Sequence, residues 1–139
     1  MKSREFCGKL PGMKTPEDIL NCWVAAVNGK DIETLVGLYG ENAVLLPTFS
    51  NRMFKDLKGI REYFQRLSQR NDLGVKLHHK PLMVQPIDLD KYALSGVYCW
   101  SFSIDGELFS FEARFSYILD MGLTRPIIHH HSSQIPRMI

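Results

Sequence analysis

The second half of the sequence consists of four long segments with the composition of β-strands, and these constrain the fold more than any other feature. Residues 75–87, 92–104, 108–119 and 126–133 are rich in Val, Ile, Phe, Tyr and Ser. Turn-forming residues separate them, and Asp105-Gly106 favours a tight hairpin. Long strands joined by such short turns predict an antiparallel sheet, because parallel strands need a longer crossover between them.

The first half has helical signals instead. Thr15 can cap a helix that begins at Pro16 and ends near Gly29, and Asp31 begins a second helix that ends at Gly40. A short strand at residues 43–47 comes next, and Ile60 starts the apolar face of a third helix that runs to about Asn71. We predict an α+β fold in which three N-terminal helices cover one face of a strongly curved antiparallel sheet. Residues 1–14 are expected to be a flexible N-terminal arm, and residues 15–139 a single domain.

Composition excludes several classes of protein. The net charge is only +2, and the Lys and Arg residues are scattered, so we expect no nucleic-acid partner. No apolar run approaches the length of about 20 residues needed for a membrane span, and no leader segment precedes the helices, so we expect a cytoplasmic protein without a membrane partner. The three cysteines are widely spaced, which favours reduced thiols.

Side chains alternate between the two faces of residues 108–119. Ser110, Glu112, Arg114 and Ser116 share one face, and the other face is aromatic. An aromatic row is too apolar to remain exposed, so we expect it to form an oligomer interface. The members of this row are Phe109, Phe111, Phe115 and Tyr117. The polar row would then line a cavity.

Three consecutive histidines lie in the last predicted strand, where alternation places His129 and His131 on one face and His130 on the other. Two histidines could bind zinc only with a third ligand, for which Glu112 is the candidate, and we predict no metal site and no cofactor. A Ser/His hydrolytic relay is not expected, because adjacent residues of a strand point in opposite directions. His131 is a candidate general acid–base, since a histidine near a carboxylate can titrate near neutrality.

The order of these elements resembles nuclear transport factor 2-like folds, which are cone-shaped domains with a bent sheet around a pocket. Several stretches are similar, more specifically, to the association (hub) domain of calcium/calmodulin-dependent protein kinase II and its stand-alone bacterial relatives. They are LYGENAVLLPTFSN, GIREYFQRL, LSGVYCWSF, FEARFSYIL and IIHHHSSQIP. The resemblance implies self-association, and a pocket for small carboxylates at the positions of Arg114, His129 and His131. A second pocket arginine of that family is replaced here by Tyr98.

The sequence therefore predicts a non-catalytic domain that forms a homodimer or a larger ring and carries a polar pocket for a small ligand, for which the resemblance implies a carboxylate. The residues assigned to the pocket are Arg114, His131, His129, Glu112, Tyr98 and Trp100. Two alternatives stay open. One is a small enzyme of isomerase or dehydratase type with His131 as the acid–base, and the other is an interaction module that regulates a separate partner such as a kinase.

Overall fold

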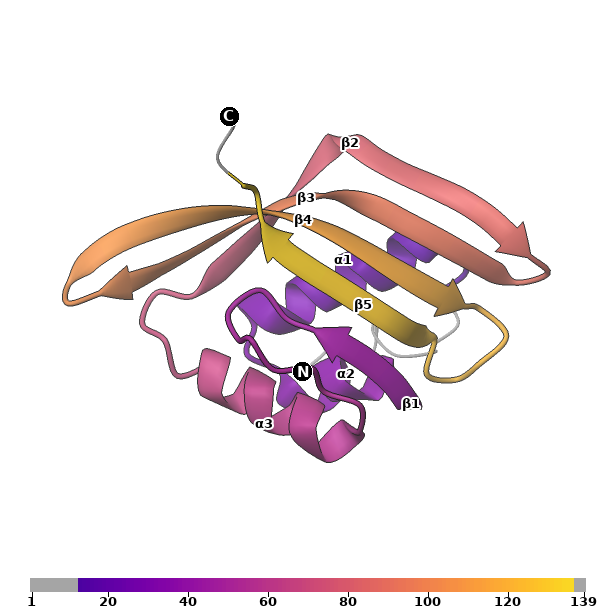
Figure 1. Ribbon diagram of the computed structural model, residues 1–139, viewed down its shortest axis with the longest axis horizontal. Helices are drawn as coiled ribbons and strands as arrows, with labels where there is room; N and C mark the ends of the chain where they lie inside the picture. The colour runs from indigo at the N-terminus through magenta and orange to yellow at the C-terminus, as the bar shows by residue number, and fades with distance from the viewer. Residues whose placement is uncertain (1–12, 137–139) are drawn as a thin grey trace.

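The computed structural model describes residues 13–136, in which helices cover one face of a bent sheet (Figure 1). The helices are α1 (Pro16–Asn28), α2 (Ile32–Gly37) and α3 (Leu57–Leu67). The strands are β1 (Tyr39–Leu46), β2 (Gly74–Asp88), β3 (Lys91–Ile104), β4 (Glu107–Asp120) and β5 (Ile127–Gln134). The predicted fold class, three helices against a curved sheet, is confirmed. No helix in the described part of the chain is long and apolar enough to cross a membrane.

Local capping chemistry sets where the helices begin. Thr15 and Asp18 form a reciprocal capping box, in which each side chain accepts a hydrogen bond from the other residue's backbone N–H. Asp31 accepts from the N–H of Thr34 at the start of α2, and Asp56 accepts from the N–H of Gly59 at the start of α3. The helix starts at Pro16 and after Asp31 are therefore confirmed.

The sheet has the strand order β1-β5-β4-β3-β2. Strands β2 to β5 are antiparallel neighbours, as predicted, whereas β1 pairs with β5 in parallel. This pairing also corrects the boundary of α2. The helix ends at Gly37 rather than at Gly40, because the chain turns into β1 and Tyr39 aligns with Ile127 of β5. Arg125 stabilises this turn by donating hydrogen bonds to the carbonyl oxygens of Val36 and Tyr39.

Two further expectations change at the ends of elements. Helix α3 ends at Leu67, four residues before the expected Asn71, with Ser68 as its C-cap. Met13 is buried in the core, so the packed part of the chain begins before Thr15. The rest of the expected N-terminal arm, residues 1–12, lies outside the described residues. Cys99 is a free thiol, but Cys22 is disulfide-bonded, so the expectation of reduced thiols is wrong at Cys22.

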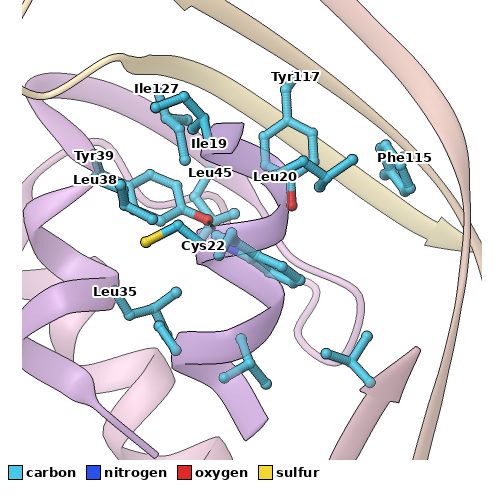
Figure 2. Packing of buried hydrophobic residues seen from close by; sticks show 14 of the residues in the cluster. Ile19, Leu20, Cys22, Leu35, Leu38, Tyr39, Leu45, Phe115, Tyr117 and Ile127 are labelled. Carbon is cyan, nitrogen blue, oxygen red and sulfur yellow. Dashed lines mark hydrogen bonds between the residues drawn. The ribbon is translucent and has the colours of Figure 1, made fainter. Parts of the chain in front are cut away.

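The core lies between the helices and the aromatic face of β4. Phe115 and Tyr117 are 3% and 1% exposed, and Figure 2 shows both in the same cluster as Leu20 of α1. Their assignment to an oligomer interface is therefore wrong, because this chain's own helices already cover them. Phe111 is half-buried and Phe109 is 38% exposed, where the β3–β4 hairpin extends beyond the helices (Figure 1). None of the described helices covers the polar face of β4.

Candidate functional site

The polar face of β4 carries the first candidate site. Arg114 and Ser116 of β4 pair with Ser133 and His131 of β5, which brings these four side chains together on the uncovered face. With Phe115 they line a small pocket of ≈160 Å³. The Ser133 hydroxyl lies 3.0 Å from Nε2 of His131. The structure thus brings together Arg114 and His131, as the sequence predicted.

The Arg114 side chain is exposed, and no described residue forms an ion pair or a hydrogen bond with it. Glu112 instead approaches His78 of β2, with 3.1 Å between a carboxylate oxygen and Nε2. His129 is half-buried on the same face as His131. Within residues 13–136 no three His, Cys, Asp or Glu residues are grouped so that they could hold a metal ion. Among the residues that the structure describes, Arg114 is therefore an unpaired cation beside two hydroxyl groups and an imidazole.

Two residues assigned to this pocket lie on the other face of the sheet. Tyr98 and Trp100 are 0% and 2% exposed, and their rings pack against Trp23 of α1. They cannot contact a ligand beside Arg114, because the sheet separates them from it. The physical reason is register: Tyr98 pairs with Ala113 and Val97 pairs with Arg114, and cross-strand partners point to the same face.

A buried hydrogen-bonded network occupies the core side of the sheet, where we predicted no site. The indole N–H of Trp23 donates to the Tyr39 hydroxyl oxygen over 2.9 Å. Tyr39 lies 2.7 Å from Nδ1 of His130, and Nε2 of His130 lies 3.2 Å from the Tyr98 hydroxyl. Each ring nitrogen of His130 is therefore hydrogen-bonded to one tyrosine hydroxyl, and in the neutral imidazole one nitrogen donates and the other accepts. His130 is thus a neutral imidazole with both nitrogens used.

Burial governs the protonation of this network. Burial lowers the pKa of His130 well below its usual range, and charge on His129 and His131 would lower it further. Burial likewise raises the pKa of Tyr39 and Tyr98. All three groups therefore stay neutral near physiological pH. The network stabilises the core rather than supplying charge.

The network continues toward the end of β5. Ser132 is buried, and its hydroxyl is hydrogen-bonded to that of Thr48, just after β1. Two buried polar atoms in the described residues have no hydrogen-bond partner, namely Nε1 of Trp100 and the hydroxyl of Tyr117. The Tyr117 ring nevertheless stacks on His130, with 3.8 Å between the ring centroids. The space between the helices and the sheet is thus filled by aromatic side chains that surround His130.

Sequence reasoning missed His130, although alternation had separated it from His129 and His131. The signal was the aromatic row of β4. If that row is assigned to the core, the face of β5 that carries His130 is assigned to the core as well. Tyr39 had no such signal, because the sequence suggested that it belonged to a helix.

This combination of helices, bent sheet and strand order is the nuclear transport factor 2-like fold, also called cystatin-like, and solved structures of that fold are similar to the chain. No protein-family model matches the sequence, and no curated protein sequence matches it. The more specific similarities of this chain to known proteins therefore come from comparison with solved structures.

Two structural neighbours are association domains. One, from Xanthomonas campestris, is described as an association domain of calcium/calmodulin-dependent protein kinase II type. It is 25% identical, with a TM-score of 0.77 over 88% of this chain and 86% of that one. The association domain of the Caenorhabditis elegans kinase is 18% identical, with a TM-score of 0.66 over 83% and 89% of the two chains. A protein assigned as an aromatic ring hydroxylase from Novosphingobium aromaticivorans is 16% identical, with a TM-score of 0.75 over 87% of each chain.

Proposed function

We propose that the chain is a non-catalytic domain that associates with copies of itself through the uncovered face of its sheet. Two structural neighbours are named for association, which supports this function. One strip of the uncovered face, which crosses β1, β5, β4 and β3 from Val44 to Ala93, carries half-buried side chains and no Lys, Arg, Asp or Glu. This composition is the observation that carries the proposal.

The strand register defines this face. Four neighbouring strands each place one residue in a row across this face, namely Val44 of β1, His129 of β5, Ile118 of β4 and Ala93 of β3. Val97 and Leu46 lie on the same face, beside Arg114 and His131 respectively, and these two apolar side chains are also half-buried in a single chain. A strip of apolar residues on a sheet face can pack against a second sheet, because packed sheets lie about 10 Å apart face to face.

Replacing Ile118 with lysine tests this proposal. The wild-type chain is expected to be a dimer or larger by light scattering, and Ile118→Lys is expected to weaken association by more than about 100-fold, because a buried ammonium group costs several kcal/mol. Leu89→Lys is the matched control, since Leu89 is 81% exposed in the turn between β2 and β3. If Ile118→Lys keeps the wild-type mass, another surface mediates association.

We also propose that the pocket beside Arg114 takes a small carboxylate. The guanidinium group has no acidic partner among the described residues, and its planar fork matches a carboxylate with two hydrogen bonds. Acetate should raise the melting temperature of the wild-type chain, and Arg114→Ala should abolish that increase. Arg52→Ala is the control, because Arg52 lies over Phe54, away from the pocket. An equal response in both variants would contradict the assignment.

A further inference from the structure

The end of α3 carries two adjoining hollows that have no part in the site on the sheet. The larger has a volume of ≈580 Å³ and the smaller ≈120 Å³. They adjoin each other, because Phe49, Ser50, Leu67 and Arg70 line both. The loop after β1 forms one wall, and α3 with the residues that follow it forms the other. The larger hollow thus lies between the end of α3 and the sheet residues Phe102 of β3 and Gln134 of β5.

Two arginines line these hollows, and neither forms an ion pair with an acidic residue in the described part of the chain. The N–H groups of Gln69 and Arg70 donate to the carbonyl oxygens of Arg66 and Leu67, so helical winding continues past the end of α3. Arg66 and Arg70, four residues apart, therefore lie on one side of it. No acidic residue lines either hollow, and the nearby Asp72 accepts a hydrogen bond from Ser103 instead. Two cations side by side without a counter-charge are suited to an anion.

A buried hydroxyl group adds a third donor. Tyr63 is 8% exposed and lines the smaller hollow. Its oxygen accepts a hydrogen bond from the N–H of Phe49 at 3.4 Å, and no described residue accepts its proton. Burial raises the pKa of Tyr63, so the group stays protonated at neutral pH. The hydroxyl can therefore donate to an acceptor in the hollow.

Aromatic rings supply the remaining walls. The rings of Phe49 and Phe102 meet edge to face with 5.2 Å between centroids, and the Arg70 guanidinium lies over Phe102 at 5.1 Å. Phe49 also covers Trp100, whose indole N–H has no hydrogen-bond partner among the described residues. These surfaces suit a planar apolar body, since aromatic rings pack against one another edge to face or offset.

We infer that this hollow at the end of α3, lined by Arg66, Arg70 and Tyr63, binds a planar aromatic carboxylate. The carboxylate accepts hydrogen bonds from the two guanidinium groups and the Tyr63 hydroxyl. The ring of the ligand packs against Phe49 and Phe102. This inference does not depend on the self-association of the chain, nor on the pocket beside Arg114, because the two sites share no residue.

Benzoate and benzamide are a matched pair of probes, because they differ in charge but not in shape. Titration of the full ¹⁵N-labelled chain, followed by NMR, should shift the backbone amides of Ser50 and Asn51 and the indole N–H of Trp100. Benzamide should bind at least about tenfold more weakly, since it removes the charge-assisted hydrogen bonds. Equal binding of the two probes, or no shift with benzoate at about 10 mM, would overturn the inference.

Variants locate the site. The double variant Arg66→Gln/Arg70→Gln should weaken benzoate binding at least about tenfold, and Tyr63→Phe should weaken it without loss of folding. Both arginine side chains are exposed, so the double variant is expected to fold. Arg52→Gln is the matched control, because Arg52 is exposed and lines neither hollow, and this variant should bind benzoate as the wild type does. If Arg114→Gln loses binding and the double variant keeps it, benzoate occupies the pocket on the sheet and the inference is wrong.

Discussion

Replacement of Trp23 with alanine is expected to lower the free energy of unfolding by about 3–5 kcal/mol, the usual cost of truncating a fully buried aromatic residue. Trp23 is 0% exposed and stacks on Tyr98 with 5.4 Å between ring centroids. Its ring also meets Trp100, Tyr117 and His130 edge to face. Alanine would leave a cavity among these rings and would remove the indole N–H that donates a hydrogen bond to Tyr39. Urea unfolding followed by far-UV circular dichroism gives the value.

Trp23→Phe separates the two contributions. This variant keeps an aromatic ring and loses the indole N–H, so a smaller loss of about 1–3 kcal/mol is expected. If Trp23→Ala lowers the free energy of unfolding by less than about 1 kcal/mol, Trp23 does not hold α1 against the sheet as described.

Acidification from pH 7.5 to pH 5.5 is expected to lower the free energy of unfolding by about 1.4 kcal/mol through His130 alone. The sign follows from the pKa of this group, which burial lowers well below its usual range in the folded chain. In the unfolded chain the imidazole takes up a proton as the pH falls below about 6.5, whereas in the folded chain it stays neutral. Well above pH 6.5 His130 does not change the free energy of unfolding. Below that pH the loss of stability grows until the pH reaches the lower pKa that His130 has in the folded chain.

The groups that face His130 do not titrate in this window. They are Trp23, Tyr39, Tyr98 and Tyr117. Urea unfolding at pH 7.5, 6.5 and 5.5 measures the slope. His130→Gln should remove it, and His131→Gln, at an exposed position of the same strand, should keep it. A wild-type chain with the same free energy of unfolding at pH 7.5 and 5.5 would show that His130 takes up a proton in the folded state.

Most of the fold was predictable from the sequence, because local signals and tertiary packing agree there. Thr15 and Asp31 cap helices in the structure as they do in isolated helices, and the turn at Asp105-Gly106 joins two long strands. Strand β1 was harder. Tyr39 and Gly40 follow a helix directly, and only the pairing of Tyr39 with Ile127, 88 residues later, makes them part of a strand. A contact at that sequence separation leaves no local pattern.

The candidate site could be predicted only in part, for a similar reason. Alternation correctly separated the two faces of β4, but it does not state which face the helices cover. Phe115 and Tyr117 lie in the core, so the aromatic row was assigned to the wrong side. Arg114 and His131 nevertheless lie together, because they share one face of the sheet and the pairing of β4 with β5 brings them side by side. The hollow beside Arg66 depends on the path of a loop, which has no periodicity to read.

Sedimentation equilibrium of the wild-type chain across a range from about 1 to 100 micromolar tests the central claim most directly. We expect a particle with at least twice the chain mass of 16.0 kDa at the upper end of this range, and hydrogen exchange in that particle should protect the amides beside Val44, Val97 and Ile118. A single species of 16.0 kDa at every concentration would contradict it.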